Sequence, residues 1–271
     1  MENFRFWYFE KFGWLFTNIY ENPILYFDLW SPVQLWSGFM FYLLLILYKT
    51  RKPLLILLSA FLLFDLLETF LGYFLFQQSG SIRFNEIFSD LLLASAGGMI
   101  ARYSVLKMIE KDPYETGKYI KTFTVLFTSI TVAFTWVGFY GYKYNVGFWN
   151  SPGLNFTAFL LWFSGQIAII SISLYIYSRI KKVIASLFLI YIIYLPALSL
   201  FEYFNYHIIK VREVGTPFRR ALFFDIIHGT TILHFFYVLA PVTGILVFLL
   251  FLNYFNKIIQ ECKKDKVAIS G

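Results

Sequence analysis

The sequence predicts an all-α fold: a polytopic integral membrane bundle of about seven transmembrane helices, preceded by an interfacial aromatic segment. Of its 271 residues, 59% are hydrophobic and only 14% are charged, whereas soluble domains carry about 25% charged residues. The mean hydropathy is +0.64. Apolar runs long enough to cross a bilayer recur along the chain, separated by short polar gaps. These three observations exclude an ordinary soluble domain.

The first thirty residues are aromatic, but Glu10, Lys11 and Pro23 interrupt every window that could span a bilayer. We expect an interfacial segment there, with one helix before Pro23. Seven spans are predicted after it, at about Val33–Tyr48, Pro53–Phe76, Glu86–Leu106, Tyr119–Tyr142, Gly153–Ser178, Val183–Phe204 and Thr230–Tyr254. We find no internal repeat or linker. The prediction is therefore one membrane domain over 1–271, with an interfacial segment at 1–30, a bundle at 31–256 and a basic tail at 257–271.

Basic residues set the predicted orientation. The formal net charge is +7, but the Lys and Arg residues fall mainly in gaps between apolar runs, which indicates topology rather than nucleic-acid binding. If seven helices alternate, four basic regions lie on one side: 49–52, 102–121, 179–182 and 257–266. By the positive-inside rule that side is cytoplasmic, with the N-terminus outside and the C-terminus inside. A bacterial-type inner membrane or plasma membrane is the expected location.

Two carboxylates stand in the middle of the second apolar run. Asp65 and Glu68 are three residues apart, so they share one face of a helix. An Asp at the centre of a membrane helix costs about 2.5–3.5 kcal/mol on insertion scales. That face must therefore look at protein or water rather than at lipid.

The next predicted helix carries a regular stripe. Glu86, Asp90, Ala94, Gly98 and Arg102 follow one another four residues apart and share one face. The spacing from Ala94 to Gly98 is a small-xxx-small pattern, which permits close helix packing. We predict that the helices at 53–76 and 86–106 pack together with four carboxylates between them. The alternative is that Glu86 and Asp90 are solvated at a helix start, where the dipole favours acids.

Further polar residues fall in the same predicted half of the bilayer. The candidate catalytic set shares acid–base or metal-ligating chemistry and comprises Asp65, Glu68, Glu86, Asp90, Glu202, Asp225, His228 and His234. The candidate substrate-binding residues are Arg212, Arg219, Arg220 and Gln166; the arginines suit an anionic head group. A divalent cation is a possible cofactor. The alternatives are a solvated arginine loop, a core histidine at 234, an interhelical glutamine at 166 and an aromatic belt at 136–142.

These residues favour an integral-membrane enzyme acting on a lipid-like substrate, either an isoprenoid or a lipid phosphate. In size, helix number and intramembrane acids, the chain resembles the small transmembrane terpene and carotenoid cyclases, without a shared motif. Two alternatives remain open: a proton- or ion-coupled transporter, and a non-catalytic membrane subunit or assembly factor whose acids pair with a partner. The predicted partners are membrane lipid and a lipid-like substrate, and no nucleic acid.

The orientation is directly testable. A reporter fused after Gly271 is expected to be cytoplasmic, because four basic regions lie on the side of the C-terminus if seven helices span. A reporter fused before Met1 serves as the opposite control and is expected outside. A C-terminal reporter found outside would contradict the predicted orientation.

Overall fold

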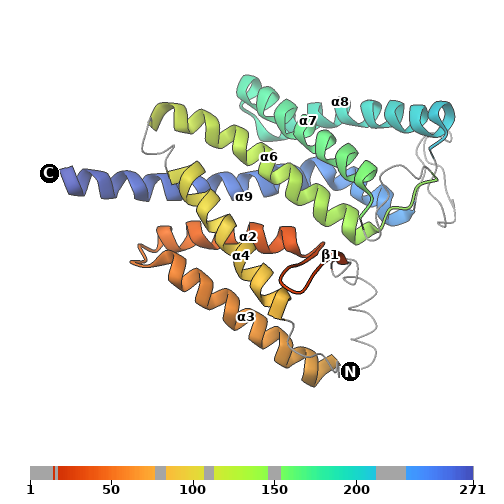
Figure 1. Cartoon of the computed structure of the whole chain (residues 1–271). Helices are drawn as coiled ribbons and strands as arrows, with labels where there is room; N and C mark the ends of the chain where they lie inside the picture. Colours follow the sequence, from red (N-terminus) through yellow and green to blue (C-terminus); the bar gives the residue numbers. More distant parts are fainter. Residues whose placement is uncertain are drawn as a thin grey trace. The chain divides into compact units, whose positions relative to one another are not determined.

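The computed structural model confirms an all-α bundle with all seven predicted helices (Figure 1). It describes the backbone of residues 15, 18–76, 84–106, 113–145, 154–211 and 230–270, and the side chains of these except 71–76, 105–106, 113–118 and 262–270. The helices are α2 (Ser31–Leu47), α3 (Pro53–Phe76), α4 (Phe84–Ile100), α6 (Pro113–Tyr140), α7 (Phe156–Ile180), α8 (Val183–Tyr203) and α9 (Thr231–Ser270). Two π-helical turns, η2 (Ala101–Leu106) and η3 (Phe204–Ile209), extend α4 and α8.

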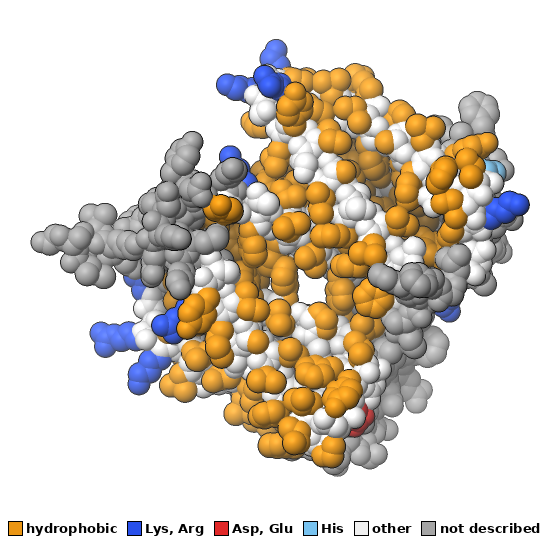
Figure 2. All heavy atoms as spheres, turned by 45° about the horizontal axis from the view of Figure 1, so that its top comes forward, with side chains coloured by type: hydrophobic (Ala, Val, Ile, Leu, Met, Phe, Trp, Pro, Cys, Tyr) orange, Lys and Arg blue, Asp and Glu red, His pale blue; other side chains and the backbone are white. Residues whose placement is uncertain are grey.

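Five of the described helices are long and apolar enough to cross a membrane: α3, α6, α7, α8 and α9. The apolar helix α2 has 17 residues and is shorter, and α4 carries Glu86 and Asp90. Hydrophobic side chains dominate the face drawn in Figure 2. An apolar surface of this extent is normal against lipid and unusual against water. The apolar helices and the apolar surface therefore indicate a multi-pass membrane protein.

The residues directly before the bundle form a hairpin that the sequence did not predict: β1 (Asn18–Glu21) pairs antiparallel with β2 (Tyr26–Asp28). The helix predicted before Pro23 falls mainly on residues outside those described. The side-chain Oδ1 of Asn22 accepts hydrogen bonds from the backbone N–H groups of Ile24 and Leu25, which closes the turn. Asn is favoured in such turns because its side chain mimics a backbone acceptor. Local turn chemistry at Asn22 thus forms the hairpin.

The last helix is longer than predicted. Helix α9 continues beyond Tyr254 to Ser270, so most of 257–271 is helical. Phe255, Ile258 and Ile259 are buried at a helical spacing. Glu261 lies 3.8 Å from the Lys49 ammonium group. The candidate membrane span of α9 runs from Thr231 to Glu261, so it continues beyond the predicted end at Tyr254 with one face buried.

The chain divides into two compact units. The first comprises 1–119 and 254–271, and the second comprises 120–253. Helix α9 contributes its first part to the second unit and its last part, from Tyr254, to the first.

The core of the first unit is a close crossing of α2 and α4. A Cβ atom added to Gly38 would overlap the backbone of Ala94, and one added to Gly97 would overlap the carbonyl oxygen of Leu35. The prediction that small residues of α4 receive another helix is confirmed, but the helix in closest contact is α2. Helix α3 also packs on α4, where Gly98 faces both Tyr42 and Leu57.

The predicted stripe on α4 ends before Arg102. Asp90, Ala94 and Gly98 are buried, whereas Arg102 is exposed. The helix becomes π-helical at Ala101, and its wider turn rotates later residues away from the α-helical register. Arg102 therefore does not extend the acidic face.

The crossing of α2 and α4 predicts an unusual response to alanine. Gly97→Ala adds helix propensity, which alone would stabilise an exposed helix by about 1 kcal/mol. Here the new methyl group collides with backbone, and overpacking costs about 1–3 kcal/mol. We expect a lower melting temperature in detergent. Gly165→Ala on α7 is the matched control, because no atom lies within 4 Å of its added Cβ. Equal melting temperatures for the two variants would contradict the close crossing.

Candidate functional site

A largely apolar cavity of about 390 Å³ lies in the second unit, between α7 and α8, with Tyr237 of α9 at its wall. Leu161, Ile169, Ile190 and Leu198 supply aliphatic walls. Gly165 leaves space in the wall, because its missing side chain would meet nothing within 4 Å. Small-molecule sites typically enclose about 300–1,000 Å³, so the cavity is large enough for a ligand.

A proline in α9 shapes one side of this cavity. Pro241 has no N–H group, so the carbonyl oxygen of Tyr237, four residues earlier, loses its helical donor. The hydroxyl of Tyr194 on α8 donates to that oxygen at 2.8 Å. The hydroxyl of Tyr191 donates to the next carbonyl, that of Val238, at 2.6 Å. Two tyrosines of α8 thus fix α9 at its proline.

The same region carries the cavity's carboxylate. Glu202 on α8 is 6% exposed and lines the cavity. Its Oε1 accepts a hydrogen bond of 2.7 Å from the hydroxyl of Tyr237. The donor comes from α9 and depends on the α8–α9 contact at Pro241.

Aromatic rings complete the wall beside this pair. Trp162 of α7 stacks on Tyr237, with ring centroids 5.6 Å apart. Its indole N–H donates to the hydroxyl of Tyr142 at 2.7 Å, and the indole of Trp136 donates to the same oxygen at 3.2 Å. Burial raises the pKa of Tyr142 well above its ordinary value, so this hydroxyl stays neutral. Trp136 and Tyr142, expected in an interfacial belt, lie instead in this internal network.

No protein-family model matches the chain, and no curated protein or solved structure matches it either. What the site can do follows from its own residues.

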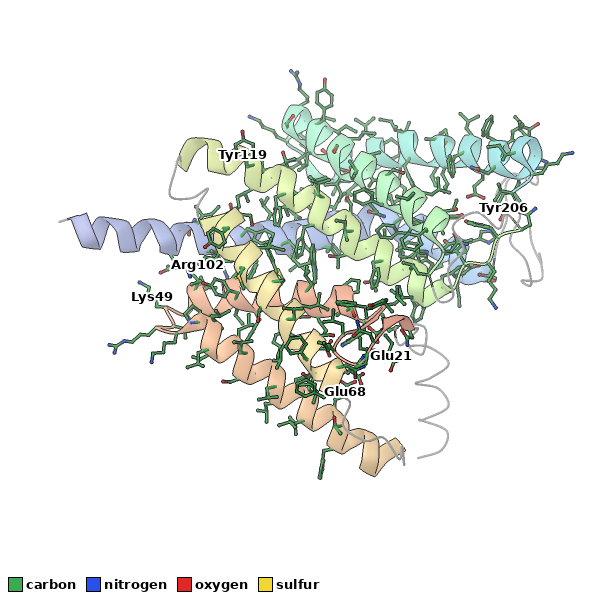
Figure 3. The ribbon with its side chains drawn as sticks, viewed as in Figure 1. Glu21, Lys49, Glu68, Arg102, Tyr119 and Tyr206 are labelled. Atoms are coloured by element: carbon green, nitrogen blue, oxygen red, sulfur yellow. The ribbon has the colours of Figure 1, made fainter. Side chains whose placement is uncertain are left out.

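A second polar site lies in the first unit. Asp90 of α4 is 9% exposed and accepts a hydrogen bond of 3.0 Å from Gln34 of α2. Electrostatic interactions connect Asp90 with Asp65, Glu68 and Glu86. Figure 3 shows Glu68 on the part of α3 beside the start of α4. The four carboxylates predicted between these helices are thus close enough to influence one another.

The first unit contributes a fifth acid that sequence reasoning did not select. Asp28 is 5% exposed at the end of β2 and also interacts with Asp90. Its Oδ1 accepts hydrogen bonds from the backbone N–H groups of Trp30 and Ser31, at 2.9 Å each. Burial raises the pKa of Asp28, and the hydrogen bonds from Ser31 and Trp30 oppose that rise. The spacing Asp28-x-x-Ser31 before a helix is a capping signal, so its main role is structural.

The other candidate site residues lie outside the cavity and the acidic cluster, or outside the described residues. His234 is half-buried on α9, three residues before Tyr237. Gln166 is fully buried in α7 against Gly244 of α9, outside the cavity lining, which favours interhelical packing over substrate contact. Arg212, Arg219, Arg220, Asp225 and His228 lie outside the described residues. Convergence of the first unit's acids with Glu202 and His234 stays a prediction.

In the described part of the chain, no three His, Cys, Asp or Glu side chains are close enough together to hold a metal ion.

Sequence reasoning missed Tyr194, Tyr237 and Trp162. One signal was available: Pro241 frees the carbonyl of residue 237, and a membrane helix needs a side-chain donor for such a group. Tyr191 and Tyr194, three residues apart on α8, were the candidates. A single sequence does not indicate which neighbouring helix these two tyrosines would face.

The bond at Pro241 can be isolated by a double-mutant cycle. Tyr194→Phe leaves the Tyr237 carbonyl without a donor, and we expect a loss of about 1–3 kcal/mol. In a Pro241→Ala background the helical N–H returns, so the same change should cost less. Tyr191→Phe is the matched control, because Val238 can keep the N–H of Val242 as its donor. Denaturation in detergent measures the free energy of unfolding of the two single variants, the double variant and the Tyr191→Phe control. If Tyr194→Phe lowers this free energy equally with and without Pro241, Tyr194 does not have this role.

Proposed function

We propose that this protein is an integral-membrane enzyme that acts on a lipid-like substrate of the isoprenoid type, held in the α7–α8 cavity, with Glu202 as the acid and base. The observation that carries the proposal is a buried carboxylate, hydrogen-bonded to Tyr237, at the wall of an apolar cavity within a membrane bundle. An apolar chain would occupy the aliphatic part of the cavity, and its reacting double bond would lie near Glu202.

The lining favours an isoprenoid over a lipid phosphate. None of the described residues that line the cavity is basic, whereas phosphate sites depend on Arg, Lys or helix N-termini. The wall near Glu202 is aromatic instead, with Trp162, Tyr194 and Phe201. Aromatic faces attract positive charge at about 0.5–2 kcal/mol per contact. Such a wall suits a reaction in which an alkene becomes transiently cationic.

The chemistry needs only one carboxyl group. Protonated Glu202 donates its proton to one carbon of the double bond, and the neighbouring carbon becomes cationic. The carboxylate then removes a proton from an adjacent carbon, which forms a new double bond and restores the acid. The product is an isomer of the substrate, with the ring or double-bond position changed. The hydroxyl of Tyr237 holds the carboxyl group of Glu202 in place at the cavity wall.

Binding tests the cavity first. Farnesol is expected to raise the melting temperature of the detergent-solubilised protein, because a ligand that binds only the folded state stabilises it. Gly165→Leu fills the cavity and should abolish this shift. Ser171→Leu is the matched control, since Ser171 is exposed on the same helix and does not line the cavity. A full shift in the Gly165→Leu variant would contradict binding at this place.

Turnover tests the role of Glu202. In D₂O the proposed reaction introduces carbon-bound deuterium into the isoprenoid, which mass spectrometry detects. Glu202→Gln should still bind farnesol and should incorporate no deuterium, because an amide cannot donate and recover the proton. Movement of farnesol across vesicles without deuterium incorporation would favour a transporter and reject the enzyme.

A further inference from the structure

The side chain of Asp65 is the most unusual polar group of the first unit. It lies in the middle of α3, within a candidate membrane span, and is 5% exposed. Both of its carboxylate oxygens are buried without a hydrogen-bond partner in the described part of the protein. The nearby Thr69 hydroxyl donates to the backbone carbonyl of Asp65 and not to the carboxylate. An ionised carboxylate would carry the full cost of desolvation here.

The charged surroundings add to this cost. Glu68 on the same helix and Glu86 on α4 both act electrostatically on Asp65. Asp90 on α4 interacts with Asp65, and Asp28 on the hairpin interacts with Asp90. Every charged group described as acting on Asp65 or Asp90 is itself acidic. Helix α2 presents the neutral amide of Gln34, which is bonded to Asp90. A second negative charge in such a group is repelled by the first.

Three kinds of positive partner could resolve the conflict: a metal ion, a basic side chain or a proton. The described acids are not close enough in threes to hold a metal ion. The burial of both Asp65 oxygens leaves them out of reach of a basic group on a molecule docked at the surface. A proton needs neither a coordination sphere nor space.

We propose that Asp65 is a proton-binding site within the membrane, and that Glu68 is the group through which protons reach it. Glu68 is exposed three residues further along α3, on the same side of the helix, and Figure 3 shows it beside α4. A buried acid with an exposed acid one turn away is the minimal arrangement for proton exchange with the surroundings. This site is independent of the α7–α8 cavity and of the reaction proposed there.

Infrared spectroscopy tests the protonation state directly. At neutral pH the full-length protein in detergent should show a protonated-carboxyl C=O band that shifts on ¹³C-aspartate labelling and loses intensity in Asp65→Asn. Asp65→Leu provides a second assignment if the amide variant fails to fold, since an apolar residue suits a membrane span. Glu68→Gln should keep the band and slow its exchange in D₂O. Glu21→Gln, which changes an exposed acid on β1, is the control and should leave the band unchanged.

Stability provides the second readout. The folded state holds a proton that the unfolded chain releases at neutral pH, so stability is greatest in acid and falls as pH rises through the titration of Asp65. Asp65→Asn should remove this part of the pH dependence. A wild-type spectrum without an aspartic-acid C=O band, or a band of unchanged intensity in both Asp65 variants, would overturn the proposal.

Discussion

Each polar group that lies within an apolar helix of this protein must find its partner in the protein, because lipid offers none. The contact of α8 with α9 shows how this requirement organises a site. Pro241 removes one helical hydrogen bond, and the carbonyl of Tyr237 becomes a buried acceptor. Tyr194 supplies the donor. That bond fixes the position of Tyr237, whose own hydroxyl then reaches Glu202. The proline, a defect for the isolated helix, thereby positions the polar group of the cavity.

The first unit solves a different problem with glycine. Gly38 and Gly97 bring the backbones of α2 and α4 together where any larger residue would collide. Close approach of backbones is a common basis for helix association in lipid, where the hydrophobic effect between helices is weak. It also determines the location of the acids. Asp90 lies one turn before Ala94 on the same stripe, so the crossing that buries Ala94 carries Asp90 against Gln34. The same helix crossing therefore both packs the two backbones and buries the carboxyl group of Asp90.

The sequence was a good guide to the elements and to the acids of the first unit, because both depend on periodicity. Seven apolar runs predicted the seven helices, and the spacing of Asp65, Glu68, Glu86 and Asp90 predicted one cluster. The hairpin was missed because aromatic residues suit helices and strands equally, and Asn22 alone carried the turn signal. The extension of α9 was missed because the lysines from Lys257 onward indicated a polar tail, although Phe255, Ile258 and Ile259 have helical spacing. Tyr194 and Tyr237 depend on which faces two helices present to each other, and one sequence does not contain that information.

The two buried carboxylates of greatest interest differ in one respect that decides their chemistry. The carboxylate of Glu202 accepts a hydrogen bond from the hydroxyl of Tyr237, which holds it at the cavity wall. Asp65 has no described donor and stands among other acids, so its charged form is disfavoured and its proton is retained. The first arrangement suits a catalytic acid that must turn over on a substrate. The second suits a group that stores a proton and exchanges it through Glu68. Burial alone would not have distinguished them, since both side chains are about equally hidden; the hydrogen-bond donor does.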